Sequence, residues 1–353
     1  MYKIGVLPGK FSPPHRGHLN AIIQASTKCE KLYVVISHNS ELEEKLYENS
    51  KMNPITLKQK ARWLSKELES FKTIKVIMMD EGNIPMYPNG WKHWSELLKE
   101  TIPENIEVIF GGEISYKDEG YTKYFPETIY EIYEEDRVRY PISATKIREN
   151  PYGNWDYILG SARSHFVKKI LIVGTESCAK TSTVEKLAKI FYTSWAREEG
   201  RYYSSKYMGS NEDVFELDDF YKIALEQKEL ENQAIRNGNK ITFLDTDALV
   251  TKYYCQQYLG ENNPKLEALI EPDKYDCVLI FTPDVKWVND GLRFLSEDKL
   301  RWELHEKIKN MYINYGYKNI IEVSGDYNQR LNSCINIVDK ILNQEDVSFY
   351  VKE

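Results

Sequence analysis

Cysteine is scarce in this sequence, and its placement excludes several kinds of protein. The five cysteines are scattered, and no pair of them has the spacing of a zinc site or of a small disulfide framework. We therefore expect reduced thiols in a cytoplasmic protein. The residues are Cys29, Cys178, Cys255, Cys277 and Cys334.

Long hydrophobic runs and an excess of basic charge are also missing. No apolar run is long enough to cross a bilayer, and no signal-peptide pattern opens the chain, so we expect no membrane partner. The formal net charge is −7 and basic residues do not cluster, so we expect no nucleic-acid partner. Apolar material is plentiful instead: 42% of the 353 residues are hydrophobic, which suffices for cores in two domains.

Short apolar runs, each followed by a turn and a helical pattern, recur in both halves of the chain. Continuous apolar strands that alternate with helices indicate parallel sheets covered on both faces. We predict two doubly wound α/β domains, a Rossmann-like domain at residues 1–165 and a second domain at residues 166–353. The expected strands are 3–7, 32–37, 75–79 and 106–110 in the first half, and 169–173, 241–244, 277–281 and 320–323 in the second.

The segment at residues 9–18 follows the first expected strand and leads into a helical pattern. Its sequence, G-K-F-S-P-P-H-R-G-H, places His15 and His18 on one face of the first helical turn, because residues three apart in a helix are neighbours. A helix N-terminus presents unpaired N–H groups and a partial positive charge. Histidine donors at such a position suit a triphosphate.

The same segment resembles the nucleotidyltransferase signature G-x-F-x-P-x-H-x-G-H, with every fixed position filled. The resemblance implies transfer of a nucleotidyl group from a nucleoside triphosphate, with the acceptor's own oxygen attacking the α-phosphorus. The protein then positions the reactants and stabilises the charge on the phosphates. By resemblance, His15 and His18 are catalytic, and Gly9, Lys10 and Phe11 belong to the ATP site.

A second segment, I-S-A-T-K-I-R at residues 142–148, resembles the I-S-x-T-x-x-R element of the same enzymes. We predict that Ser143 caps the N-terminus of a helix. The resemblance implies that Ser143, Thr145 and Arg148 hold the β- and γ-phosphates of ATP, which leave as pyrophosphate. An arginine suits this position because its charge is permanent and its donors form a fork.

Residues 174–182, G-T-E-S-C-A-K-T-S, stand between an expected strand and a helix and resemble the Walker A pattern G-x-x-x-x-G-K-[ST]. Ala179 replaces the second glycine of the pattern, and we expect it to keep a negative φ, at which its methyl group is tolerated. Lys180 is predicted to reach the β- and γ-phosphates, and Thr181 to ligate Mg²⁺. The predicted ATP site comprises Gly174, Glu176, Ser177, Ala179, Lys180, Thr181, Ser182 and Arg293, the last on a lid-like charged segment.

Two aspartates follow the strand expected at residues 241–244. Carboxylates at the end of a parallel strand beside a phosphate loop suit Mg²⁺ and the activation of a hydroxyl acceptor. The predicted metal ligands are therefore Thr181, Asp245 and Asp247, and Asp245 is also a predicted catalytic residue. An aspartate after a strand also caps helices, and that reading stays open for one of the two.

A nucleotidyltransferase followed by a P-loop kinase resembles the bifunctional nicotinamide mononucleotide adenylyltransferase/ribosylnicotinamide kinase family, over almost the whole chain. The segments at residues 50–52, 83–91, 200–201 and 290–293 carry the resemblance further. It implies NAD salvage, with ATP, nicotinamide riboside, nicotinamide mononucleotide and NAD as small-molecule partners and Mg²⁺ as cofactor. Lys51, Asn89 and Trp91 are the implied nicotinamide-nucleotide residues, and the indole of Trp91 suits stacking on a pyridinium ring.

Two other functions stay open at this point. One is an adenylyltransferase or cytidylyltransferase for a different acceptor, such as phosphopantetheine or a flavin, fused to an unrelated kinase. The other is a catalytically weak pyridine-nucleotide sensor, which the alanine at position 179 favours. Some members of the resembled family carry an N-terminal helix-turn-helix repressor domain, whereas here the first expected strand begins at Tyr2. The sequence is compatible with a homo-oligomer and does not fix the oligomeric state.

Overall fold

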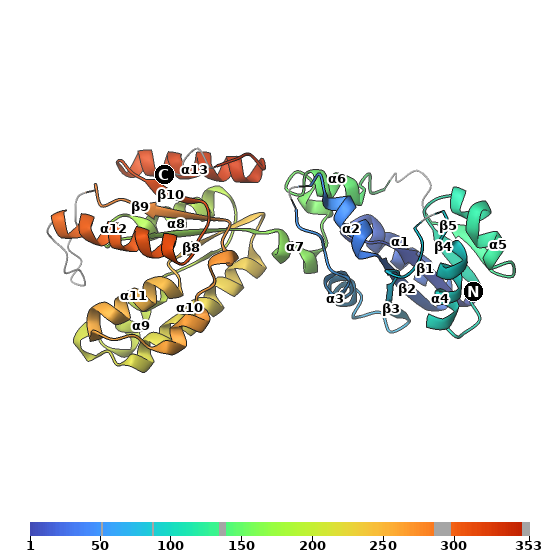
Figure 1. Cartoon of the computed structure of the whole chain (residues 1–353), viewed down its shortest axis with the longest axis horizontal. Helices are drawn as coiled ribbons and strands as arrows, with labels where there is room; N and C mark the ends of the chain where they lie inside the picture. The colour runs from blue at the N-terminus through green and yellow to red at the C-terminus, as the bar shows by residue number, and fades with distance from the viewer. Residues whose placement is uncertain (51, 87, 134–138, 286–297, 348–353) are drawn as a thin grey trace. The chain divides into compact units, whose positions relative to one another are not determined.

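Contacts between residues divide the chain into two compact units, Met1–Arg163 and Ser164–Glu353. The computed structural model describes residues 1–50, 52–86, 88–133, 139–285 and 298–347. Each unit contains one five-stranded sheet in which every neighbouring pair of strands is parallel. Helices lie along the sheets in both units (Figure 1). The predicted α/β fold class is therefore confirmed.

The sheet of the first unit has the strand order β3-β2-β1-β4-β5. Its strands are β1 (Tyr2–Gly9), β2 (Cys29–His38), β3 (Ile74–Asp80), β4 (Val108–Gly111) and β5 (Ile129–Ile132). Its helices are α1 (Arg16–Ser26), α2 (Ser40–Tyr47), α3 (Leu57–Glu67), α4 (Trp91–Thr101), α5 (Thr122–Tyr124) and α6 (Ala144–Glu149), and α7 (Gly160–Phe166) follows them. Strand β1 lies in the middle of this sheet. The turn that follows it therefore lies at the centre of the carboxyl edge, where ligands of such sheets bind.

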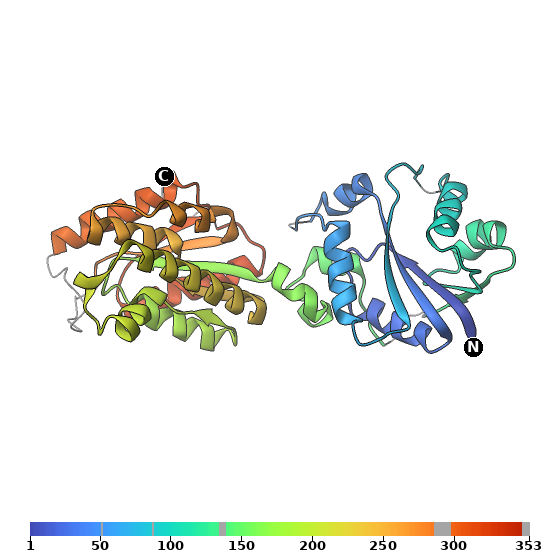
Figure 2. The same ribbon diagram turned by 90° about the horizontal axis from the view of Figure 1, so that it is seen from below.

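The sheet of the second unit has the strand order β10-β9-β6-β8-β7. Its strands are β6 (Lys168–Gly174), β7 (Trp195–Ala196), β8 (Ile241–Asp245), β9 (Cys277–Phe281) and β10 (Ile320–Val323). Its helices are α8 (Lys180–Ile190), α9 (Glu199–Tyr207), α10 (Leu217–Asn237), α11 (Ala248–Leu259), α12 (Asp298–Asn314) and α13 (Tyr327–Leu342). Figure 2 shows this sheet from below, between its helices.

Two hydrophobic clusters cover the two faces of the second sheet. One joins the sheet to α8 and α13 through residues such as Leu187 and Ile337. The other joins it to α10, α11 and α12 through residues such as Leu249 and Ile308. Both faces of the central strand β6 are therefore buried, which explains why its sequence is a continuous apolar run.

All eight expected strands are present, and the sequence missed β5 and β7. The residues of β5 are exposed or half-buried, and Glu131 within it pairs with Lys28, so the strand carries no continuous apolar pattern. Strand β7 has only two residues, too few for any periodicity. Among the described helices, none combines the length and the apolar character that a bilayer crossing requires.

Candidate active sites

The turn after β1 is shaped by two close contacts of its own side chains. Phe11 has a φ of 49°, and its buried ring lies edge-on to the imidazole of His18, with 5.0 Å between ring centroids. A Cβ atom on Gly9 would lie 3.0 Å from the Phe11 ring, so the glycine allows the ring to fold back over the strand. Lys10 lies on the same turn, and its backbone oxygen accepts a hydrogen bond from the side chain of Lys60 (3.0 Å).

His15 and His18 form a reciprocal cap at the N-terminus of α1. His15 is the N-cap residue, and its Nδ1 accepts from the backbone N–H of His18 (3.4 Å), whereas the Nδ1 of His18 accepts from the N–H of His15 (3.3 Å). The two rings stack, with 3.7 Å between their centroids. Because both Nδ1 atoms act as acceptors, the proton of each neutral ring resides on Nε2. The cap thus orients two Nε2–H donors, which is what a phosphate site at a helix N-terminus requires.

The second predicted motif meets this turn through Arg148. Ser143 caps α6 as predicted, its hydroxyl accepting from the N–H of Lys146 (3.2 Å). The buried Arg148 guanidinium donates to the hydroxyl of Thr145 (3.1 Å) and to the backbone oxygen of Ser12. The structure therefore brings residues 9–18 and 143–148, more than a hundred positions apart in the chain, into direct contact.

A buried ion pair that no sequence motif predicts supports this turn. Lys60 on α3 is fully buried, pairs with Glu43 on α2, and holds the Lys10 carbonyl. Glu43 in turn accepts from the hydroxyl of Ser12. Burial lowers the pKa of the Lys60 ammonium, an effect that the neighbouring Glu43 carboxylate opposes. A lysine inside a helical pattern ordinarily faces solvent, so only the tertiary structure identifies this one.

The predicted nicotinamide residues occupy different surroundings. Trp91 begins α4 and is half-buried in an aromatic cluster, edge-to-face with Trp94 (5.8 Å between ring centroids) and Tyr121 (5.1 Å). Asn89, in the turn before α4, is exposed. Glu81 follows β3, and its carboxylate accepts from Nε1 of Trp94 (2.8 Å), while burial raises its pKa. Lys51 lies outside the described residues.

In the second unit, the loop after β6 has the backbone of a phosphate-binding loop. Gly174 has a φ of 148°, and a Cβ atom there would lie 2.6 Å from the Phe281 carbonyl oxygen, so only glycine fits. Ser177 also has a positive φ, of 59°. The expectation of a negative φ at Ala179 is wrong: its φ is 68°, in the left-handed region. Ala179 occupies the N-cap position of α8. There it adopts the left-handed backbone conformation that a glycine adopts easily, and glycine is the residue of the Walker pattern at this position.

Lys180 and Thr181 begin α8 and face different partners. The Lys180 ammonium donates to the Thr175 carbonyl of the same loop (2.9 Å), and the Thr181 hydroxyl donates to Asp245 Oδ2 (2.6 Å). Asp245 is fully buried at the end of β8, and its Oδ1 accepts no hydrogen bond from any residue that the structure describes. Burial raises the pKa of this carboxyl to about 7, and the nearby Glu198 carboxylate adds to the effect. The hydroxyl of Ser182 donates to the Ala179 carbonyl (3.1 Å) on the exposed side of the helix.

Asp247, the third predicted metal ligand, caps a helix and accepts hydrogen bonds from two tyrosines. It is the N-cap of α11, and its Oδ1 accepts from the Val250 N–H (3.3 Å) and from the Tyr312 hydroxyl (2.5 Å). Its Oδ2 accepts from the Tyr317 hydroxyl (2.5 Å). Both carboxylate oxygens therefore accept hydrogen bonds inside the core, which fits the helix-capping alternative for Asp247, and the predicted magnesium site at Thr181, Asp245 and Asp247 stays a prediction.

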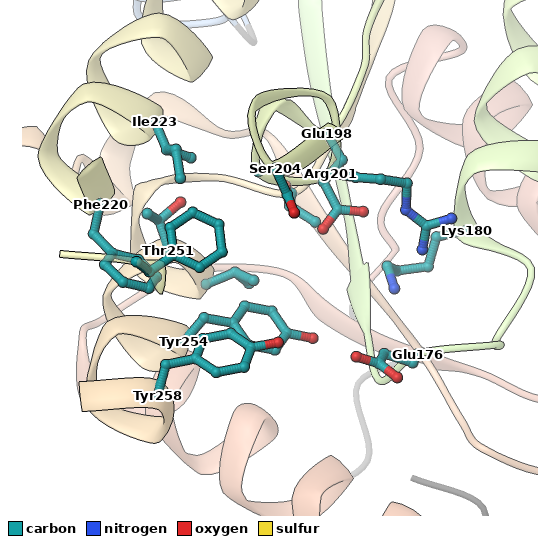
Figure 3. A pocket seen from close by; sticks show the side chains of 14 residues that line it. Glu176, Lys180, Glu198, Arg201, Ser204, Phe220, Ile223, Thr251, Tyr254 and Tyr258 are labelled. Carbon is teal, nitrogen blue, oxygen red and sulfur yellow. The ribbon is translucent and has the colours of Figure 1, made fainter. Parts of the chain in front are cut away.

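A pocket opens beside the phosphate loop, between α9, α10 and α11 (Figure 3). Lys180 and Glu176 of the loop border one end, together with Arg201 and Glu198 near α9. Phe220, Tyr254 and Tyr258 line the other end. Apart from Glu176 and Lys180, the residues named here were not predicted as site residues. Arg201 lies in a segment that carried the family resemblance without a role, and the others lie on or next to helices that no motif marks. The predicted Arg293 lies outside the described residues, and Arg301 is buried on α12, donating to the Val285 carbonyl (3.0 Å).

Comparisons with known proteins agree with this arrangement. Residues 6–150 match the cytidylyltransferase-like family, and residues 169–330 match an AAA domain family. The first unit is also similar to the phosphopantetheine adenylyltransferase of Mycoplasma mycoides, at 30% identity over 156 residues, which cover 42% of this chain and 95% of that protein. The fold and its two sites thus define an enzyme with a nucleotidyltransferase unit followed by a P-loop kinase unit.

Full-length relatives identify the family. The trifunctional NAD biosynthesis/regulator protein NadR of Escherichia coli is 30% identical over 346 residues, covering 97% of this chain and 84% of that protein. The Salmonella typhimurium NadR is 31% identical over 350 residues. Crystal structures of NadR in complex with NR, and with NAD and AMP-PNP, superpose with TM-scores of 0.80 each, at 25% and 26% identity, and cover 96% and 97% of this chain. The chain belongs to the NadR family of NAD biosynthesis proteins, as the sequence motifs predicted.

Proposed function

We propose that the second unit phosphorylates nicotinamide riboside with ATP and that the first unit joins the resulting mononucleotide to the adenylyl group of ATP, giving NAD and pyrophosphate. Membership of the NadR family supports both steps. Relatives crystallised with NR, NAD and AMP-PNP support the same substrates here. The observation that carries the proposal is the presence of two separate phosphate-binding turns, one at the carboxyl end of each central strand.

In the first unit, the phosphate oxygen of the mononucleotide attacks the α-phosphorus of ATP, and pyrophosphate leaves. His15 and His18 donate from Nε2 to the phosphate oxygens on which negative charge grows, and their reciprocal cap holds both rings in place. Arg148, Thr145 and Ser143 bind the leaving phosphates. Such preorganised donors stabilise the transition state without further rearrangement. The Trp91 cluster supports a site for the nicotinamide ring at the same edge of the sheet.

In the second unit, the acceptor hydroxyl attacks the γ-phosphorus of ATP. Lys180, now bonded to its own loop, is placed to bind the β- and γ-phosphates. The buried Oδ1 of Asp245 and the hydroxyl of Thr181 fit a hard cation, so we assign the Mg²⁺ site to these two residues. When bound, Mg²⁺ would neutralise charge on the phosphates. The aromatic end of the pocket suits a pyridinium ring.

The buried, reduced cysteines support a cytoplasmic location for this chemistry. The direct test is a time course with nicotinamide riboside and Mg-ATP, in which mononucleotide, dinucleotide and pyrophosphate are separated and quantified. We expect mononucleotide to appear first and NAD to follow. Turnover of phosphopantetheine but not of nicotinamide mononucleotide would overturn the assignment of the first unit, and binding of riboside without phosphorylation would favour the sensor function.

A further inference from the structure

One hydroxyl group in the pocket of the second unit has no explanation in the fold. Ser204 lies on α9 and is 3% exposed, and its Oγ makes no hydrogen bond with any residue that the structure describes. Its backbone oxygen accepts from the N–H groups of Met208 and Ser210, so the side-chain oxygen is the polar atom left without a partner among the described residues. A buried hydroxyl without a partner costs stability. We therefore expect a bound ligand to supply the hydrogen-bond partner of this hydroxyl.

The place of Ser204 within the pocket indicates which part of a ligand it meets. In Figure 3 its hydroxyl points into the pocket from above, between the aromatic side chain of Phe220 and the charged side chains of Arg201 and Lys180. Phosphoryl transfer requires the acceptor hydroxyl at the Lys180 end. A planar cationic ring fits the opposite end, beside Tyr254 and Tyr258. The group that joins these two parts of a riboside is the sugar.

We propose that Ser204 is a specificity-determining residue that recognises a secondary hydroxyl of the ribosyl group of the phosphoryl acceptor. The inference rests on the proposed kinase function and adds to it a selection against deoxyribosides. The physical reason is that the Ser204 hydroxyl is already desolvated in the free protein, so a ribose hydroxyl gains a hydrogen bond at little additional cost. A deoxy analogue leaves the buried hydroxyl unpaired, and a site of this kind discriminates strongly against such an analogue.

The test compares Ser204→Ala with Ser205→Ala, because Ser205 is the next residue on the same helix and is exposed. The substrates are nicotinamide riboside and its 2′-deoxy and 3′-deoxy analogues, each with saturating Mg-ATP. We expect Ser204→Ala to lower kcat/KM for the riboside about three- to tenfold, the size of one hydrogen bond, mainly through KM. We also expect it to lose most of the wild-type preference for the riboside over one of the two deoxy analogues. The KM for ATP, the adenylyl transfer rate and all parameters of Ser205→Ala should not change.

A second readout separates recognition from a purely structural role. Removal of a buried hydroxyl that has no partner should leave the melting temperature of the ligand-free protein unchanged or raise it, although recognition of the substrate is impaired. A lower melting temperature together with an unchanged preference for the riboside would overturn the assignment of Ser204. If the wild-type protein phosphorylates the riboside and Ser204→Ala still discriminates fully against the deoxy analogues, the assignment of Ser204 is wrong and the kinase function stands. Wild-type protein that phosphorylates no riboside would overturn the kinase function itself.

Discussion

At the scale of single residues, Ala179 has a backbone conformation that disfavours its own side chain. An L-residue in the left-handed region costs about 1–2 kcal/mol, whereas glycine has no such penalty there. Glycine also adds about 0.4–1 kcal/mol of conformational entropy to the unfolded chain, which offsets part of the gain. We therefore expect Ala179→Gly to raise the unfolding free energy of the second unit by up to about 1 kcal/mol, measured by chemical denaturation. Kinase activity should rise only modestly, because the loop already has the required shape.

Ala188→Gly is the matched control for this substitution. Ala188 is buried in the last turn of α8 and does not have a positive φ, so the same change there should lower the unfolding free energy by about 1 kcal/mol. Destabilisation by both substitutions would contradict the left-handed conformation at position 179. A large gain of activity from a nearly inactive parent would instead favour the sensor function.

Lys60 provides a second test at this scale, in the first unit. Lys60→Met leaves the buried Glu43 carboxylate without its cation, and losing one partner of a buried pair costs about 3–5 kcal/mol. We expect the unfolding transition of the first unit to shift by that amount and adenylyl transfer to fall with it. The exposed Lys58 lies on the same helix, so Lys58→Met should change neither. Lys60→Arg keeps the charge, and full loss of activity in that variant at normal stability would argue that the lysine acts on substrate directly.

At the scale of elements, the sequence predicted those strands and helix starts that carry continuous apolar runs or a capping residue. The eight expected strands and the Ser143 cap are present for this reason. Strands β5 and β7 were missed because partial exposure and short length remove the apolar pattern. The residues of the two phosphate-binding turns could be predicted from the sequence, because each motif is contiguous. The pocket residues on α9, α10 and α11 could not be predicted as site residues, because tertiary packing brings them together.

The N-terminus of α11 provides a test of whether Asp247 caps the helix or binds the metal. Asp247→Ala removes the cap, about 1 kcal/mol, and leaves the buried hydroxyls of Tyr312 and Tyr317 without acceptors, about 1–3 kcal/mol each. We expect a loss of about 3 kcal/mol or more from the second unit, measured by denaturation. In the protein that remains folded at low temperature, the Mg²⁺ concentration for half-maximal kinase activity should not change. A several-fold increase in that concentration would restore Asp247 to the metal site.

At the scale of the whole molecule, the buried Asp245 makes the stability of the second unit depend on pH. The pKa of this carboxyl is about 7 in the folded protein and near 4 in the unfolded chain, so the folded state holds a proton that the unfolded state releases between these values. The stability of the second unit therefore decreases as pH rises from about 4 to about 7. Asp245→Asn removes this dependence and should raise the melting temperature at pH 8 but not at pH 4. An equal shift at both pH values would show that the carboxyl ionises normally.

The two activities should be separable because each has its own unit and its own phosphate-binding turn. His18→Ala removes a donor in the first unit, a change that commonly costs about a hundredfold or more in rate, and should spare riboside phosphorylation. Lys180→Ala should do the reverse. A mixture of the two variants should convert riboside to NAD again, with a lag, because the mononucleotide diffuses from one protein to the other. Equal loss of both activities in either folded variant would contradict the two-site arrangement.

The central position of β1 and β6 also determines the order in which the nascent chain closes its two sheets. Each is the first strand of its unit to be synthesised, and each waits for partners on both sides. The first sheet is complete once Ile132 has left the ribosome, before any strand of the second has been made. In the second unit, β6 waits for β8, which begins at Ile241, and then for β9, which ends at Phe281. During that interval a very apolar strand has both edges open, and long-range parallel pairing is slow. We therefore expect β6 to be the described strand whose edges stay unpaired longest during synthesis, which exposes it to misfolding.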